Sequence, residues 1–367
     1  MRYVHMDSIE DIATGAAVLG TGGGGDPYIG KMMAMQALET YGEVELCSCD
    51  ELNDDDLVVP VSMIGAPSVM VEKVPSEREL SAVLDLLEKT VGKRISAVMP
   101  IEVGGVNSLI PFIAAAKRRI PIVDADAMGR AFPEAQMVTF HLDGYSPSPV
   151  AMADEKGNAL LLYPTDGVWS ERLARSVTIQ MGGSASICDY ALLGKEIKKS
   201  AIPGTLTLAE EIGRILRTSL HSGRRPVETL LEKLQGYLLF SGKVVDVRRY
   251  IHGGFTKGES QLEGLGSWKG RSMTLCFQNE YLAALENNQP LASTPDLLAA
   301  LDQETGLPIT TERLRYGMRV QVIALPCHEK WRTKKGIEVV GPRYFGYDFD
   351  YKPVEHRFNE QGQTCTD

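Results

Sequence analysis

The feature that most constrains this fold is the alternation of short apolar runs with helical segments through the first 165 residues. The run at 56–65 is apolar almost throughout, as expected of a strand covered on both faces. Strands that alternate with helices predict a mostly parallel sheet flanked by helices. The segments expected as strands or helices are, in chain order, 43–49, 56–65, 76–92, 95–105, 107–119 and 120–129.

The second half of the chain has a different pattern. Helical spacing at 205–220 and 226–236 is followed by short apolar runs crowded with glycines, which is typical of a compact, sheet-rich domain with tight turns. We therefore predict an α/β fold with two domains. The N-terminal domain spans 1–165 and carries the site, and a smaller, sheet-rich α+β domain spans 166–367.

Charge and hydropathy narrow the class of partner. The chain has 38 basic and 48 acidic residues, a net charge of -10, which disfavours nucleic acid or an anionic membrane as a partner. No apolar run approaches the ~20 residues of a membrane span, and the N-terminus lacks a signal-peptide core. We expect a cytoplasmic protein that acts on a small molecule and forms a homo-oligomer.

Four consecutive glycines, Gly22, Gly23, Gly24 and Gly25, follow a predicted helix. A dinucleotide fingerprint needs a strand before its glycines, and a P-loop needs a lysine that is missing here. Backbone N–H groups in such a run, next to the helix that opens at Asp26, form a site for an anion. The hypothesis is a substrate-binding loop, and the alternative is a turn between two helices.

The segment 100–108 places Glu102 and Asn107 after a predicted strand. Ligands of open α/β sheets bind at the carboxyl ends of strands, so both side chains are candidates to face a substrate. Glu102 is a candidate general acid or base. The alternative is a surface carboxylate beside an ordinary turn.

The segment 123–137 concentrates polar chemistry after the next strand. Asp124 and Asp126 are two positions apart, which puts them on one face of an extended chain. Paired carboxylates repel each other and need a proton, an arginine or a metal between them. We predict a divalent metal, zinc by preference, held by Asp124, Asp126 and His141. Arg130 is a candidate substrate ligand, and Glu134 a candidate acid or base. The alternative is an Asp–Arg network that pins the loop.

Two further positions lie in the second half. His252 stands beside two glycines and is predicted to reach a site between the domains, although a turn histidine without a role is the simpler interpretation. Asn279 and Glu280 end an alternating strand, and we place them at the domain interface.

A family likeness is carried by several segments in combination. It rests on LGTGGGGDPY (19–28), IEVGGVNS (101–108), VDADAMGRAFPEAQM (123–137) and GPRYFGYDFDYKP (341–353), with GKVVDVRR (242–249) and FTKGES (255–260). Together they resemble the S-methyl thiohydantoin desulfurase family over nearly the whole chain. The resemblance implies an α/β domain, a smaller C-terminal domain and hydrolytic removal of methanethiol from an S-methylated thiohydantoin. A related cyclic imide or amidine is implied as well, because members accompany hydantoinase-type enzymes.

The chemistry of these residues and the family resemblance both fit one mechanism, and two alternatives to it remain. A metal would activate water, Glu102 or Glu134 would move protons, and the glycine loop and Arg130 would bind a substrate carboxylate. One rival omits the metal and uses Asp126 with Glu134 as the acid/base pair. The other is a ligand-binding or regulatory subunit of a hydantoinase-like assembly, with no chemistry of its own.

Overall fold

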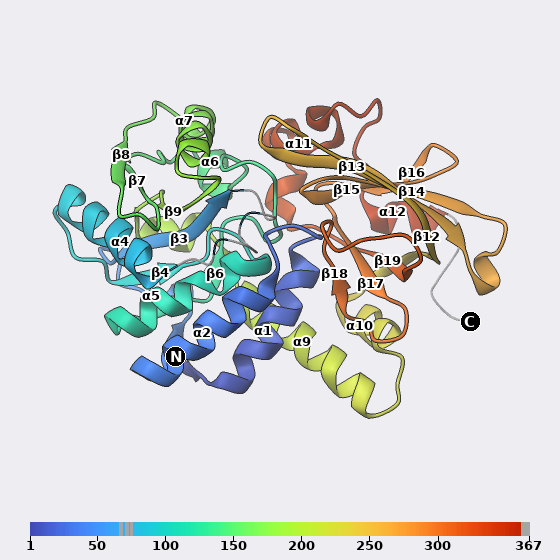
Figure 1. The fold of residues 1–367 in the computed structure, drawn as a ribbon, viewed down its shortest axis with the longest axis horizontal. Coiled ribbons are helices and arrows are strands. Elements are labelled where there is room, and N and C mark those ends of the chain that lie inside the picture. Colours follow the sequence, from blue (N-terminus) through green and yellow to red (C-terminus); the bar gives the residue numbers. More distant parts are fainter. Residues whose placement is uncertain (66–68, 70–72, 74–75, 361–367) are drawn as a thin grey trace.

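The computed structural model describes residues 1–65, 69, 73 and 76–360, and shows two sheets lying side by side (Figure 1). The helices in this part of the chain are α1 (Met6–Leu19), α2 (Pro27–Tyr41), α4 (Glu77–Val91), α5 (Ile110–Arg118), α6 (Thr139–Leu142), α7 (Gly167–Gln180), α8 (Gly194–Ser200), α9 (Thr205–His221), α10 (Pro226–Leu234), α11 (Lys334–Val340) and α12 (Val354–Glu360).

The first sheet has a parallel centre. Its order is β1-β2-β5-β4-β3-β9-β7-β8, and β10 also pairs with β3. Strands β2, β5, β4 and β3 run parallel, whereas the pairs on either side of them are antiparallel. The predicted α/β class is confirmed. The strands are β1 (Arg2–Val4), β2 (Val44–Cys47), β3 (Leu57–Gly65), β4 (Ala97–Met99), β5 (Ile122–Val123), β7 (Val150–Ala153), β8 (Ala159–Leu162), β9 (Ser184–Cys188) and β10 (Leu192–Leu193).

Local sequence signals explain the helices on this sheet. Ser76 and Glu79 form a capping box at the start of α4, in which the Ser76 N–H donates to the Glu79 carboxylate at 2.8 Å. Gly92 ends that helix in the left-handed conformation, with φ of 70°. The central strand β3 is buried from Leu57 to Ile64, as its apolar run predicts.

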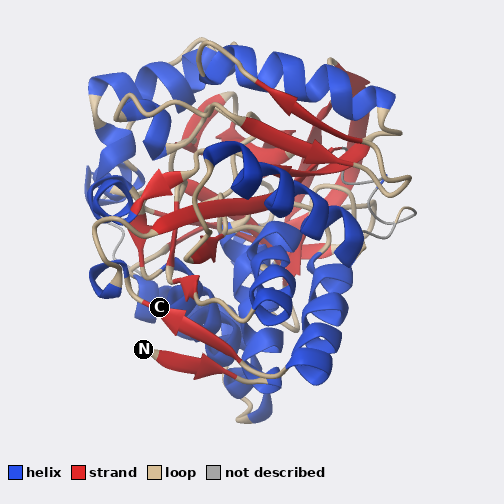
Figure 2. Cartoon of the chain, turned by 90° about the vertical axis from the view of Figure 1, so that its left-hand side faces the viewer, coloured by secondary structure: helices blue, strands red, loops and turns tan. Residues whose placement is uncertain are grey.

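The two halves of the chain are interleaved. Residues 184–193, which follow the domain boundary predicted at 165/166, add β9 and β10 to the first sheet. Helix α9 packs along α1 where glycines allow the backbones to touch, since a Cβ on Gly213 would lie 2.0 Å from the Asp11 carbonyl oxygen. Figure 2, viewed from the side of the first sheet, shows helices packed around strands.

The second sheet is antiparallel throughout. Its order is β16-β15-β14-β13-β12-β19-β17-β18, and it encloses a separate apolar core. A small ladder of β6 with β11 lies outside both sheets. These strands are β6 (Ala125–Asp126), β11 (Ile202–Pro203), β12 (Tyr237–His252), β13 (Phe255–Gly264), β14 (Ser272–Gln278), β15 (Glu280–Glu286), β16 (Gln289–Ser293), β17 (Leu297–Asp302), β18 (Pro308–Ile309) and β19 (Arg319–Leu325).

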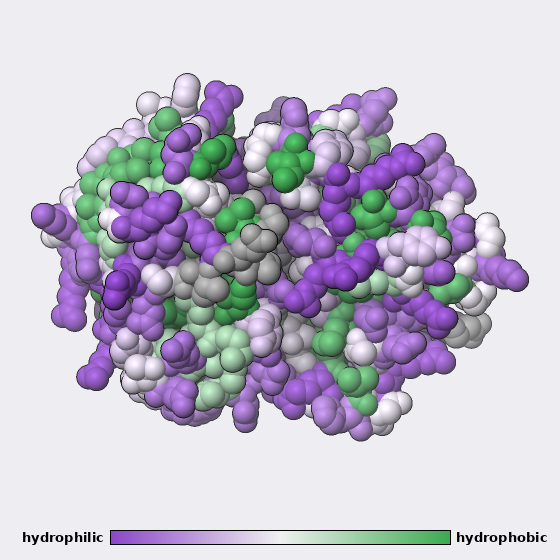
Figure 3. Space-filling model, in the orientation of Figure 1, coloured by the Kyte–Doolittle hydropathy of each residue, from purple (hydrophilic) through white to green (hydrophobic). Residues whose placement is uncertain are grey.

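Hydrophilic side chains cover most of the face shown in Figure 3. Apolar side chains gather on that face where β7 and β8 lie in Figure 1. Among the described helices, none combines the length and the apolar character that crossing a bilayer requires.

Candidate functional site

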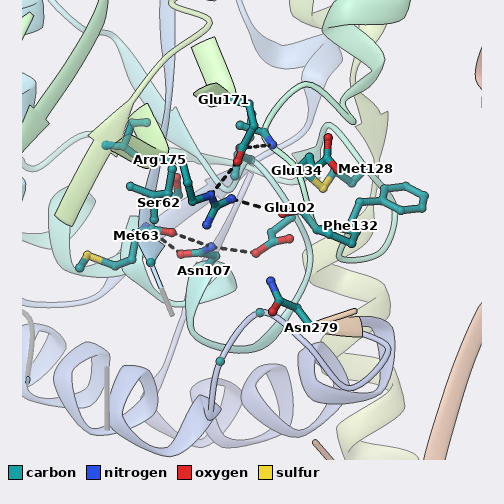
Figure 4. A pocket seen from close by; sticks show the side chains of 18 of the residues that line it. Ser62, Met63, Glu102, Asn107, Met128, Phe132, Glu134, Glu171, Arg175 and Asn279 are labelled. Carbon is teal, nitrogen blue, oxygen red and sulfur yellow. Dashed lines mark hydrogen bonds and ion pairs between the residues drawn. The ribbon is translucent and has the colours of Figure 1, made fainter. Parts of the chain in front are cut away.

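A pocket lies where the end of β3 and the loop after β4 meet the corner between β14 and β15 (Figure 4). The cavity has a volume of about 720 Å³, part of it open to solvent. Its apolar lining is Met63, Ile64, Ile101, Met128, Phe132 and Ile187. Its polar lining is Ser62, Glu102, Asn107, Glu134, Glu171, Arg175, Asp189, Asn279 and Glu280.

The glycine run forms one wall of this pocket. Gly24 and Gly25 line the cavity, and their backbone packs directly on that of Gly105, where a Cβ would lie 2.2 Å from the Gly25 carbonyl oxygen. Gly23 faces the second sheet instead, because its Cβ would lie 2.0 Å from a carboxyl oxygen of Glu280. A Cβ on Gly22 would lie 2.4 Å from the ring of Tyr281. Glycine is therefore required here for close approach.

Glu102 projects into the pocket from the loop after β4. Asn107, on the turn that follows, donates to Glu102 Oε1 at 2.8 Å and is itself fixed by the Met63 backbone at 2.8 and 3.2 Å (Figure 4). Burial raises the pKa of Glu102 to about 7, although the hydrogen bond from Asn107 opposes the shift. Near neutral pH this carboxyl group can both accept and release a proton.

Glu280 enters the pocket from the second sheet. Asn279 before it has φ of 56°, and its side chain accepts from the Thr256 N–H at 2.9 Å, which fixes the corner between β14 and β15. Glu280 is 3% exposed, and its Oε2 has no hydrogen-bond partner. Burial raises its pKa well above the usual range, and the nearby Glu102 adds to the shift, while Arg130 opposes it.

Asp189, Glu171 and Arg175 also line the pocket. Asp189 follows β9 and is 4% exposed, and burial raises its pKa to about 7. On α7, Arg175 Nε donates to Glu171 Oε1 at 2.6 Å. The guanidinium of Arg175 also stacks on the ring of Phe255, 4.7 Å from its centre, so the second sheet contacts α7 at the pocket.

The acidic pair after β5 does not line this pocket. Asp124 accepts from the backbone N–H groups of Leu206 and Thr207 at 3.0 and 3.1 Å, and so caps the first turn of α9. Asp126 is fully buried and accepts from the N–H groups of Val103 and Gly129 at 2.6 and 2.9 Å. Both carboxyl groups therefore serve backbone donors.

The expected metal site is not assembled. Asp124 and Asp126 bind different backbone segments, and His141 lies on α6, near Lys335 and Asp166, where burial lowers its pKa. In the part of the chain that the structure describes, no three His, Cys, Asp or Glu side chains are grouped so that they could hold a metal ion. The three predicted ligands thus do not form one donor set.

Arg130 is structural, contrary to the expectation that it binds substrate. It is fully buried, and its five N–H groups donate to five oxygens, which leaves none for a ligand. The acceptors lie on loops of the N-terminal half and on β15 and the loop before β17 in the second half, so Arg130 joins the two halves of the chain. They are Ala131 O, Pro295 O, Asp296 O, Thr21 Oγ1 and Tyr281 O.

Glu134 and His252 have different surroundings from those predicted. Glu134 lines the pocket, but its Oε2 accepts from Tyr344 at 2.7 Å and from Gln136 at 2.5 Å, so it is already engaged. His252 is exposed at the tip of the β12–β13 hairpin and is not a lining residue. Phe255 makes the contact with the pocket wall there.

The sequence pointed to some of these side chains and missed others. It singled out Glu102, Asn107 and the glycine run, and it placed Asn279 and Glu280 at the interface, where they line the pocket. Asp189 was missed, because the serines at 184 and 186 interrupt the apolar pattern of the strand that precedes it. Arg175 gave no signal, because a charged residue on an amphipathic helix is ordinary.

Comparisons with known proteins match almost the whole chain. Residues 7–163 match the model of the S-Me-THD-like N-terminal domain, and residues 165–354 match that of the S-Me-THD-like C-terminal domain. A crystal structure of a protein from Chromobacterium violaceum is 23% identical, with a TM-score of 0.81 over 96% of this chain and 100% of that chain, and shares the fold. A search of curated proteins finds no match.

Proposed function

Because the chain belongs to the S-Me-THD-like family, as its sequence motifs indicated, we propose that it hydrolyses the C–S bond of an S-methyl thiohydantoin. The products are methanethiol and the corresponding hydantoin. The pocket described above is the proposed site, since it draws carboxyl groups from both family domains.

In the proposed mechanism, Glu102 is the base and Glu280 is the acid. Glu102 takes a proton from water as the water oxygen bonds to the ring carbon that carries sulfur, and Glu280 gives its proton to the ring nitrogen. The C–S bond of the resulting intermediate then breaks. Glu102 returns its proton to the departing sulfur, and the new hydroxyl gives its proton to Glu280, which restores both residues.

The unequal surroundings of these two carboxyl groups support the assignment. Asn107 stabilises ionised Glu102 by a hydrogen bond, whereas Glu280 Oε2 is buried without one. Environments that separate the pKa values of two neighbouring acids are the usual basis of an acid/base pair. This contrast between Glu102 and Glu280 is the observation that carries the proposal.

Asp126 acts as a positioning residue in this scheme. Its carboxyl group accepts from the Val103 N–H, adjacent to Glu102, and from the Gly129 N–H on the next loop. It therefore ties the loop that carries Glu102 to the loop beneath the pocket. No proton-transfer role is needed for it.

The experiment is a turnover assay for methanethiol release from an S-methyl thiohydantoin, with Glu102→Gln as the test variant. Glu232→Gln, an exposed position on α10, is the matched control. Glu102→Gln is expected to lower kcat by about 100-fold or more, since general base catalysis contributes about 10²–10⁴-fold. Absence of turnover by the folded wild-type protein would overturn the proposal, and ligand binding without turnover would favour a regulatory subunit.

A further inference from the structure

The pocket contains many more acids than cations. Five carboxyl groups line it, and Arg175 is the one cationic side chain among the lining residues that the structure describes. The charge of Arg175 is already matched by Glu171, at 2.6 Å, and its face is covered by Phe255. The remaining acids thus have no cationic partner within the described lining.

Two of these acids lack partners although they are buried. Glu280 Oε2 makes no hydrogen bond. Asp189 accepts from its own backbone N–H, and no other described residue is found to hydrogen-bond to its carboxyl group. Each side chain is at least nine-tenths buried and lines the cavity. Buried polar groups are ordinarily satisfied, so a carboxyl oxygen with no donor, in the same cavity as a carboxyl group bonded only to its own N–H, points to a ligand that supplies the missing donors.

We propose, on the basis of the function inferred above, that the pocket holds its ring substrate as a planar isothiouronium-type cation, formed when Glu280 gives its proton to the ring nitrogen, with Asp189 and the resulting Glu280 carboxylate as the anionic partners. Such a cation presents N–H groups, which carboxylates accept in strong, charge-assisted hydrogen bonds. Neutral imides and ureas offer N–H groups without the charge. The ligand class is therefore the cyclic amidinium, of which an S-methyl thiohydantoin protonated on its ring nitrogen is one member.

This proposal couples binding to proton release. In the empty pocket, burial raises the pKa of Asp189 to about 7 and raises that of Glu280 well above its usual range. Glu280 faces Glu102, Arg130 and Glu312, and Asp189 faces Cys188 and Tyr190. A bound cation favours the ionised carboxylates and so lowers their pKa values. Protons leave when the cation enters, and affinity for the cation increases as pH rises through neutrality.

The test is calorimetric titration with two ring probes that need no turnover. One is 2-(methylthio)-2-imidazoline, a cyclic isothiouronium that is cationic at neutral pH, and the other is the neutral urea 2-imidazolidinone. Titrations in two buffers with different ionisation enthalpies give the number of protons released. The proteins are the wild type, Asp189→Asn and the surface control Glu232→Gln.

We expect the wild type to bind the cation at least about 10-fold more tightly than the urea, with net proton release, because hydrogen bonds to charged groups are the stronger ones. Asp189→Asn should weaken cation binding by about 10-fold or more and urea binding by less than about 2-fold. Equal affinities for the two probes, or cation binding without proton release, would overturn the proposal. If Asp189→Asn does not fold, Glu280→Gln is tested in its place, and it should likewise weaken binding of the cation more than binding of the urea.

The outcomes separate this inference from the proposed function. Preferred cation binding by a protein that does not turn over an S-methyl thiohydantoin keeps the binding site and rejects the hydrolase. If the protein turns over an S-methyl thiohydantoin but binds the cationic and the neutral probe equally well, the proposed hydrolase activity stands. The cationic state assigned to the bound substrate is then wrong.

Discussion

The corner between β5 and β6 and the pocket both contain buried or half-buried acids, but they differ in how fully those acids are hydrogen-bonded. Asp124 and Asp126 accept from backbone N–H groups, two of which lie more than 80 residues along the chain from Asp124. In the pocket, Asp189 and Glu280 each accept from their own backbone N–H, and Glu280 Oε2 has no hydrogen-bond partner. Burial raises the pKa of Asp126 to about 8 and that of Asp189 to about 7, so the two regions differ in the hydrogen bonds around their acids and not in the direction of the pKa shift.

The largest expected difference between the two regions is in catalysis. Glu280→Gln should lower kcat by about 10²–10⁴-fold, since it removes the proton donor, whereas Asp124→Asn should leave kcat within about 2-fold. Steady-state assays of methanethiol release measure both. Similar losses of activity in the two variants, with both proteins folded, would mean that the corner and the pocket do not differ in function.

The free energy of unfolding should depend more on the acids at the corner than on those in the pocket. Asp126→Ala leaves two buried N–H groups unpaired and should lower the free energy of unfolding by about 2–6 kcal/mol, at about 1–3 kcal/mol for each group. Asp124→Ala removes a helix cap and should cost about 0.5–2 kcal/mol. Asp189→Asn should cost nothing measurable. Urea denaturation ranks the three, and a large loss in Asp189→Asn would show that its carboxyl group is structural.

The pH dependence of stability is a smaller effect. Asp189 has its pKa raised from 3.8 to about 7 by burial, so its protonated form is favoured in the folded state. Its contribution to stability is complete below the unfolded pKa and is lost as pH rises through the folded value. The melting temperature of the wild type should therefore fall between about pH 4 and 8, and less steeply in Asp189→Asn. Parallel curves for the two proteins would contradict this origin.

Chelation should have the smallest effect. The predicted ligands Asp124, Asp126 and His141 are not grouped, and the first two are used by backbone donors, so a metal at this corner has no donor set. Dialysis against a strong chelator, followed by elemental analysis and assay, is expected to leave kcat unchanged. If chelation abolishes activity and adding back one divalent metal restores it, the mechanism requires that metal.

The sequence predicted local features well and remote partners poorly. Three local patterns were read from the sequence: the alternation of strands and helices, the glycine run, and Glu102 directly after a strand. The structure contains the alternation, and the glycine run and Glu102 line the pocket. Whether Asp124 is a ligand or a helix cap depends on Leu206 and Thr207, which periodicity does not place beside it. For the same reason, the sequence could not show that Gly23 makes room for Glu280.

The central claim is that Glu280 holds a proton at neutral pH while it lies buried near Glu102. Infrared difference spectroscopy of the wild type against Glu280→Gln, each between pH 6 and pH 9, measures that proton directly. A protonated carboxylic acid band that is present in the wild type at neutral pH and missing from the variant is the predicted result. A carboxylate band for Glu280 throughout this range would contradict the account, because no acid would then stand opposite Glu102.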